Sequence, residues 1–129
     1  MMIVAITLLL ILDLIWIKTN KNMYNTLVKQ VTGKPLRLNP IGALIAYPLM
    51  IIALVFIVLR NAKLDNGTPL YLAIKHGGLL GLVVYGVFNA TNVAMFQGYD
   101  IKVAVMDTLW GTFVYTLVTY VALRLTIVS

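Results

Sequence analysis

Apolar residues come in four long blocks that short polar connections separate. The blocks carry almost no charge and cover Met1–Ile17, Ile41–Leu59, Gly77–Phe96 and Val103–Leu123. A bilayer's hydrocarbon core of about 30 Å takes about 20 helical residues to cross. Each block is close to that length, so the pattern predicts one domain, residues 1–129, with transmembrane helices over about residues 1–17, 41–59, 72–96 and 103–123.

Two other architectures fit the pattern poorly. Membrane barrels need strands that alternate apolar and polar residues, whereas the second block reads "LMIIALVFIVL" without alternation. Soluble domains carry about 25% charged residues, whereas this chain has 11% charged and 61% hydrophobic residues. We therefore expect an all-α fold, an integral membrane four-helix bundle.

The first connection contains a helical pattern of its own, over about residues 21–32. Its apolar side chains fall at helical spacing: Met23, Tyr24, Leu27, Val28 and Val31. Polar residues take the opposite face, which predicts a short amphipathic helix lying on the membrane surface. The alternative is a solvated connector that packs its apolar face on the bundle. Gly33 and Pro35 follow as a helix stop.

Basic residues indicate the orientation and the lipid partner. Six lie on the first-loop side: Lys18, Lys21, Lys29, Lys34, Arg37 and Lys102. Four lie on the other side: Arg60, Lys63, Lys75 and Arg124. The positive-inside rule then places the first loop in the cytoplasm and both termini opposite. In so apolar a chain, a net charge of +6 favours anionic lipid headgroups over nucleic acid. We expect the five basic residues of the first loop to contact those headgroups.

Polar residues inside the helices gather at one depth. Asp13 lies five residues before Lys18, and Asp107 lies five residues after Lys102, which is about 7 Å into the membrane in each case. Asn89 and Asn92 share a face of the third helix, which ends on the same side. Tyr47 enters the same layer from the second helix. The sequence therefore predicts one polar layer near the first-loop side.

Each buried aspartate belongs to an Asp-x-x-Trp pattern. The spacing places Trp16 beside Asp13 and Trp110 beside Asp107 on their helices. An indole N–H can donate to a carboxylate on its own helix or on a neighbouring one. A buried aspartate costs about 2.5–3.5 kcal/mol at a helix centre. Two readings stay open: the aspartates join helices by hydrogen bonds, or they line a cavity that binds a cation, a proton or a polar headgroup.

Other motifs favour packing over chemistry. Gly77-x-x-x-Gly81 and Gly42-x-x-x-Ala46 have the small-residue spacing of closely packed membrane helices. The single histidine, His76, lies toward the opposite membrane face, and the chain has no cysteine. No catalytic triad, phosphate loop or paired-histidine motif occurs in the sequence. These absences disfavour an enzyme, although an intramembrane carboxylate pair could in principle catalyse proton transfer. We expect neither a bound metal nor a cofactor.

Three stretches carry a family resemblance: "LDLIWI", "AYPLM" and "YGVFNATNVAMFQGYDIKVAVMDTLWGT". The chain resembles a family of small bacterial predicted membrane proteins of unknown function, over nearly its whole length. The resemblance implies four helices and a set of motif residues: Asp13, Trp16, Tyr85, Asn89, Thr91, Asn92, Asp107, Trp110 and Gly111. The family commonly has aspartate in place of Asn89 and tryptophan in place of Tyr99.

Two functions from different classes follow. The first is a small binding or transport unit, which would act as a homo-oligomer because four helices rarely enclose a full pathway. Its intramembrane site comprises the polar residues of the layer: Asp13, Trp16, Tyr47, Tyr85, Asn89, Thr91, Asn92, Asp107 and Trp110. The second is a structural membrane protein that organises an assembly through its basic first loop.

Overall fold

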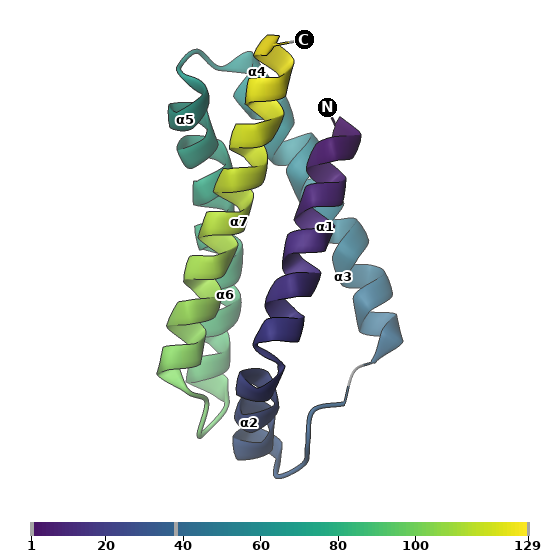
Figure 1. Cartoon of the computed structure of the whole chain (residues 1–129). Helices are drawn as coiled ribbons and strands as arrows, with labels where there is room; N and C mark the ends of the chain where they lie inside the picture. The colour runs from purple at the N-terminus through teal and green to yellow at the C-terminus, as the bar shows by residue number, and fades with distance from the viewer. Residues whose placement is uncertain (1, 38, 129) are drawn as a thin grey trace.

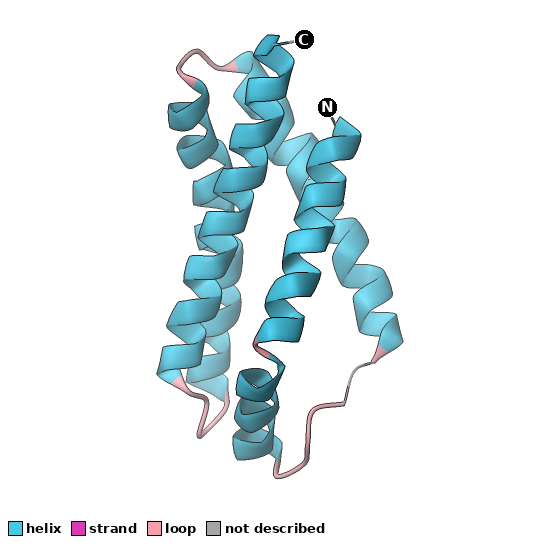
Figure 2. Cartoon of the chain, viewed as in Figure 1, coloured by secondary structure: helices cyan, strands magenta, loops and turns pink. Residues whose placement is uncertain are grey.

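Helices make up every regular element in the described part of the chain (Figure 2). This computed structural model describes residues 2–37 and 39–128. Four helical runs are long and apolar enough to cross a membrane: Met2–Thr19, Pro40–Leu64, Pro69–Met95 and Ile101–Thr126. The prediction of an all-α bundle of four membrane-length helices is thereby confirmed.

The two middle runs each join α-helix to a π-helical stretch. The second run comprises α3 (Pro40–Ile52), η1 (Ala53–Leu59) and α4 (Arg60–Leu64). The third comprises α5 (Pro69–Leu72), η2 (Ala73–Gly78) and α6 (Leu79–Met95). The first and fourth runs are α1 (Met2–Thr19) and α7 (Ile101–Val128). The helices extend past the apolar blocks because helical hydrogen bonding continues into the polar flanks.

The first connection holds a separate helix, α2 (Lys21–Thr32). It ends at Gly33, which has a φ of 75° and whose N–H donates to the carbonyl of Lys29. That left-handed conformation suits glycine, because a Cβ would be strained there. Asn39 caps the start of α3: its side chain accepts from the N–H of Ile41, and Pro40 is the first residue of the helix. The helix stop at Gly33 was predicted from the sequence, because a glycine followed by a proline is a local helix-ending signal.

Antiparallel packing puts the chain's two ends together. Both termini lie at one end of the bundle, whereas α2 and the α6–α7 loop lie at the other (Figure 1). Helix α3 leans away from α1 toward Pro40, so the bundle is widest at the α2 end (Figure 1). The polar groups of α1, α2, α6 and α7 described below lie toward this end.

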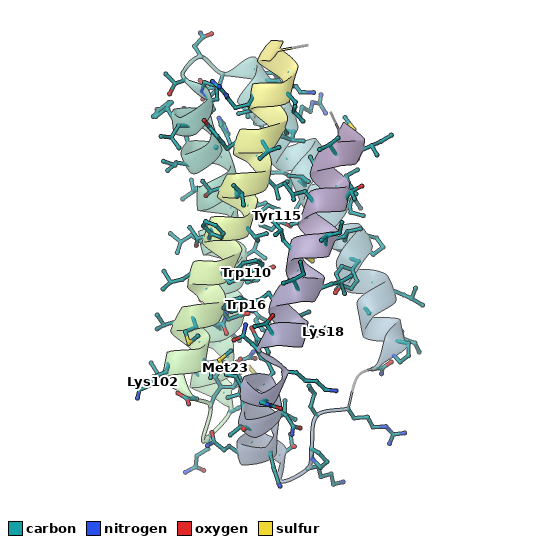
Figure 3. The ribbon with its side chains drawn as sticks, viewed as in Figure 1. Trp16, Lys18, Met23, Lys102, Trp110 and Tyr115 are labelled. Carbon is teal, nitrogen blue, oxygen red and sulfur yellow. The ribbon has the colours of Figure 1, made fainter. Side chains whose placement is uncertain are left out.

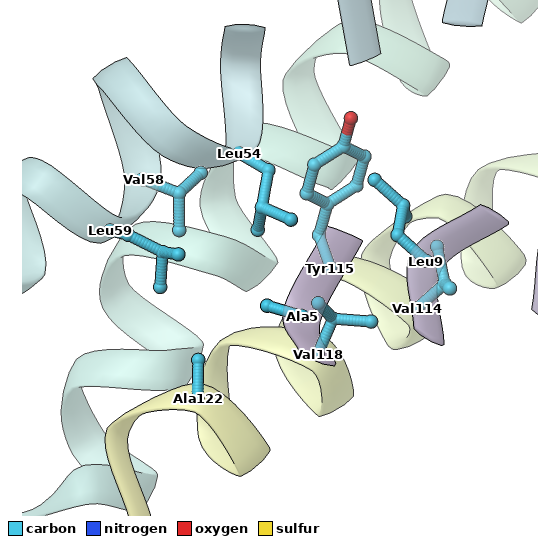
Figure 4. Close-up of a cluster of buried hydrophobic side chains, with 9 residues drawn as sticks. All are labelled: Ala5, Leu9, Leu54, Val58, Leu59, Val114, Tyr115, Val118 and Ala122. Carbon is cyan, nitrogen blue, oxygen red and sulfur yellow. The ribbon is translucent and has the colours of Figure 1, made fainter. Parts of the chain in front are cut away.

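Three helical runs share an apolar core, whose side chains Figure 4 shows. Ala5 and Leu9 of α1 face Leu54 and Val58 of η1, and side chains of α7 fill the space between them. The α7 side chains are Val114, Tyr115, Val118 and Ala122. Dense packing of this kind contributes much of the attraction between membrane helices, because lipid tails are as apolar as leucine.

Glycines allow α6 and α7 to approach closely. A Cβ on Gly81 would collide with the backbone carbonyl of Gly111, and one on Gly111 would collide with the ring of Tyr85. Gly77 is similarly close to Tyr115 and Thr119 of α7. The prediction of small-residue packing is therefore confirmed at Gly77-x-x-x-Gly81. It is wrong for Gly42, where an added Cβ would meet nothing within 4 Å, because α3 leans away from its neighbours.

Candidate functional site: a polar-ended cavity beside α2

A cavity of about 1030 Å³ lies at the wide end of the bundle, between α1, α2, α3, η1, α6 and α7. Most of its lining is apolar, including Leu49 on one side and Phe88 on another. Each of these two side chains is 58% exposed, so the cavity reaches the surface that would face lipid. A smaller set of polar side chains lines the same cavity: Asp13, Lys21, Tyr24, Thr32, Tyr85, Asn92, Tyr99, Asp107 and Tyr115.

Asp107 of α7 is held by donors on two other helices. The hydroxyl of Tyr24 donates to one carboxylate oxygen at 2.6 Å, and the side-chain amide of Asn89 donates to the other at 2.7 Å. Hydrogen bonds to an ionised acceptor are short and strong. Asp107 therefore connects α7 to α2 and to α6.

Tyr24 extends this network to the first helix. Its hydroxyl oxygen accepts the indole N–H of Trp16 at 2.7 Å while its own proton goes to Asp107. Burial, and then the bond to Asp107, raises the pKa of Tyr24. Tyr24 thus remains a protonated donor at neutral pH, and α2 is attached to both α1 and α7 by one side chain.

Asn89 is fully enclosed at the other end of the network. Its amide donates to the backbone carbonyl of Tyr85 as well as to Asp107. Its own carbonyl accepts from the hydroxyl of Tyr99, at a longer 3.3 Å, and Asn92 donates to that same hydroxyl at 3.4 Å. An amide can satisfy a donor and an acceptor together. Asn89 therefore joins the carboxylate to the α6–α7 loop.

The two tryptophans stack on each other between α1 and α7. The ring centroids of Trp16 and Trp110 lie 4.6 Å apart with an interplanar angle of 5°, and Figure 3 labels both. The sequence places each tryptophan beside the aspartate of its own helix. In the structure the N–H of Trp16 instead goes to Tyr24, while the polar neighbour that Trp110 faces is Asp13 on the opposite helix.

Asp13 of α1 differs from Asp107 in having few donors. It is 7% exposed and lines the cavity. The indole of Trp110 and the hydroxyl of Tyr47 are close enough to act on its charge. Neither makes a hydrogen bond of regular geometry with it, and within the described residues the buried indole nitrogen of Trp110 has no other partner. The carboxylate is thus buried with much of its acceptor capacity unused.

Two further tyrosines lie near Asp13. Tyr85 lines the cavity, and its hydroxyl makes no hydrogen bond with the residues that the structure describes, although the charge of Asp13 acts on it. Tyr115 donates to the backbone carbonyl of Met50 in α3 at 3.1 Å, which joins α7 to the leaning helix. Among the tyrosines that line the cavity, the hydroxyls of Tyr24, Tyr99 and Tyr115 are hydrogen-bonded, and the hydroxyl of Tyr85 has no partner among the described residues.

Not every predicted residue belongs to this site. Thr91 is exposed and lies outside the cavity lining, because two residues along a helix turn it away from the face of Asn89. Tyr47 is half-buried and adjoins Asp13 without lining the cavity. The other predicted members line the cavity or belong to the network around it: Asp13, Trp16, Tyr85, Asn89, Asn92, Asp107 and Trp110.

Sequence reasoning missed Tyr24 as a hydrogen-bonding residue, although it joins α2 to both α1 and α7. Its position on the apolar face of the amphipathic pattern indicated packing alone. The available signal was its hydroxyl, since a tyrosine buried on that face needs a polar partner. Tyr99 and Tyr115 were also missed as hydrogen-bonding groups.

The basic residues of the first loop all lie at this end of the molecule. Lys18, Lys21, Lys29, Lys34 and Arg37 are exposed, and none forms an ion pair with any residue in the described ranges. Lys21 also lines the cavity. Positive charge therefore surrounds the wide end on the outside, while the carboxylates lie inside.

A second polar cluster lies at the opposite end. Asp65 binds Lys75 at 2.7 Å and His76 at 2.9 Å, beside a shallower cavity of about 570 Å³. These two partners hold the pKa of Asp65 below its usual range. The cluster joins the loop after α4 to η2, far along the helices from Asp13.

Fold and site together define a class: a multi-pass membrane protein of four helices with a polar-ended cavity at one end. The chain belongs to the family described as "Predicted membrane protein (DUF2177)", whose sequence model matches residues 1–124. No curated protein and no solved structure matches the chain. Family membership thus agrees with the membrane assignment and adds no activity.

Proposed function

We propose that this protein binds an amphipathic molecule taken from the membrane, with the apolar chain in the cavity and the polar head beside Asp13. The observation that carries the proposal is the lining of the cavity, which is apolar along most of its walls and has buried polar groups in one part. Ligand sites have this composition, with volumes of about 300–1,000 Å³.

The opening of the cavity indicates where the ligand comes from. Leu49 and Phe88 are cavity-lining and lipid-exposed at once. An amphiphile can enter between α3 and α6 without leaving the bilayer. An apolar chain gains about 0.8 kcal/mol per methylene only when it leaves water, so affinity here depends on shape and on the head group.

The two tryptophans allow binding to be measured directly. They are the chain's only tryptophans, and Trp16 lines the cavity. Brominated alkyl chains quench indole fluorescence on contact. The protein, in phosphatidylcholine nanodiscs, is titrated with ω-bromododecyl amphiphiles that carry an ammonium, hydroxyl or sulfate head. We expect saturable quenching by at least one of them and reversal by the unbrominated analogue.

A cavity-filling variant separates binding from partitioning into lipid. Ala46 lines the cavity, whereas Ala90 is exposed on α6 outside the lining. We expect Ala46→Leu to weaken the saturable quenching and Ala90→Leu to leave it unchanged. Quenching that rises linearly for all three amphiphiles, and identically in both variants, would overturn the proposal.

The structure also favours a second function, in which the basic end anchors the protein to anionic headgroups. The observation is that the five exposed basic side chains of the first loop have no ion-pair partner in the described residues. A basic residue near an anionic membrane surface contributes about 1 kcal/mol. Native mass spectrometry should show retained phosphatidylglycerol that is lost when Lys29 and Lys34 become glutamine. Equal retention of phosphatidylcholine would argue against this role.

A further inference from the structure

The unused acceptor capacity of Asp13 carries a more specific inference, which rests on the proposed function. Asp13 is 7% exposed, and the two donors near it, the indole of Trp110 and the hydroxyl of Tyr47, act on its charge without forming a hydrogen bond of regular geometry. A buried charge whose hydrogen bonding is incomplete is costly. The carboxylate lines a cavity that is open to the membrane, so a ligand can supply what the protein does not.

The neighbouring carboxylate does not compete for that ligand to the same extent. Both oxygens of Asp107 already accept short bonds, from Tyr24 and Asn89. The charge of Asp107 nevertheless acts on Asp13. Two residues therefore contribute the negative charge in this part of the cavity, and Asp13 is the one with hydrogen-bond acceptor positions left for a ligand.

The chemistry of the available groups favours one kind of head. The hydroxyl of Tyr85 offers an acceptor next to Asp13 that no described residue uses. A primary ammonium supplies three donors and a compensating charge. A hydroxyl head supplies one donor and no charge, and a trimethylammonium head supplies charge without donors. An anionic head would be repelled by both carboxylates.

We propose that the cavity selects amphiphiles with a primary ammonium head, which Asp13 and the Tyr85 hydroxyl hold. Lys21 is the only basic residue among the described residues that line the cavity, and its side chain is exposed at the α2 end. A bound amine would therefore meet no competing basic side chain deep in the site. The apolar walls accept the alkyl chain, and the opening beside Phe88 lets it enter from lipid.

The test compares four head groups on one chain. ω-Bromododecylammonium, its N-trimethyl form, the alcohol and the sulfate are titrated against the protein by tryptophan quenching. Zwitterionic phosphatidylcholine nanodiscs keep surface charge from concentrating the cations. We expect the primary amine to bind at least about tenfold more tightly than the alcohol and the trimethyl form, as coupling of a buried charge pair implies, and the sulfate to bind most weakly.

Substitutions at Asp13 assign the preference to this residue. Asp13→Asn should remove the advantage of the amine and leave the affinity of the alcohol within about twofold, since a twofold change is well under 1 kcal/mol. Asp13→Glu should retain part of the advantage, which shows that the fold tolerates a change at this position. Asp100→Asn is the matched control, because Asp100 lies in the α6–α7 loop and accepts from the N–H of Lys102.

The outcomes separate the two proposals. If no amphiphile quenches saturably, the proposed function is wrong and this inference is wrong with it. If all four bind saturably with equal affinity, or if Asp13→Asn keeps the preference for the amine, the cavity binds amphiphiles but Asp13 does not select their heads. Tighter binding of the sulfate than of the primary amine would likewise overturn the inference while leaving the binding function in place.

Discussion

The Asp-x-x-Trp pattern occurs in both α1 and α7, but its aspartate has a different role in each helix. In α7, Asp107 accepts two short bonds from other helices, and Gly111 after Trp110 is packed against Tyr85. In α1, only the Trp110 indole and the Tyr47 hydroxyl act on Asp13 as donors among the described residues, and neither forms a hydrogen bond of regular geometry. Ile17, which follows Trp16, is 37% exposed. The difference shows that a buried aspartate becomes a structural group only where neighbouring helices supply its donors.

The difference between the two aspartates should be largest in stability. Asp107→Ala removes the acceptor of both Tyr24 and Asn89, so we expect the free energy of unfolding to fall by about 2–3 kcal/mol, at about 1–1.5 kcal/mol per bond. SDS titration in mixed micelles, followed by tryptophan fluorescence, measures it. Asp13→Ala is the matched truncation and should cost far less. Equal losses would mean that Asp13 has donors comparable to those of Asp107.

The residue after each tryptophan provides a second, somewhat smaller contrast. Gly111→Ala would place a methyl group in the ring of Tyr85, so we expect a loss of about 2 kcal/mol, typical of an overfilled site. The same change should weaken amphiphile binding, because Tyr85 would be pushed into the cavity. Ile17→Ala, at the equivalent position of α1, should be milder. A stable Gly111→Ala variant would contradict the close α6–α7 approach.

The connection that runs through Tyr24 can be removed without changing its ring. Tyr24→Phe deletes the donor to Asp107 and the acceptor of the Trp16 N–H. We expect a loss of about 1–2 kcal/mol, less than for Asp107→Ala, because the Trp16–Tyr24 bond joins two neutral groups. Hydrogen exchange should accelerate in α2 and stay unchanged in the centre of α7. Tyr99→Phe is the control, since its bonds are longer, at 3.3 and 3.4 Å. An equal effect from both variants would argue against a special role for Tyr24.

The smallest effect should come from Asp13→Asn. It keeps the shape of the side chain and removes a charge that the protein leaves largely unbonded, so we expect the free energy of unfolding to change by less than about 0.5 kcal/mol. Replacing a buried polar group by one of the same shape is often nearly neutral. Asp107→Asn in the same SDS titration should cost more. One carboxylate oxygen becomes an NH2 group, which would then face a donor, either the Tyr24 hydroxyl or the Asn89 amide. The reverse order would exchange the roles of the two aspartates.

Most of the fold was predictable, for a simple reason. The length of each apolar block is set by the bilayer, and antiparallel connection fixes which ends meet. Depth follows from counting residues, so the sequence could bring Asp13, Asn89 and Asp107 to one end of the bundle. The local stop signal at Gly33 gave the end of α2.

The site was only partly predictable, because local sequence patterns do not determine how the helices rotate and tilt against one another. The lean of α3 leaves Gly42 without neighbours and widens the end that contains the cavity. The docking of α2 brings Tyr24, a residue of its apolar face, between Trp16 and Asp107, where its hydroxyl bonds to both. Neither follows from periodicity, since each depends on contacts between residues far apart in the chain.

The sequence by itself determined four membrane-length helices, their antiparallel order and the common depth of their polar groups, because hydrophobic length and residue count are properties of single helices. Only the tertiary structure decided that Asp107 is bonded while Asp13 faces a cavity. A carboxylate's role depends on which donors surround it, and those donors come from other helices.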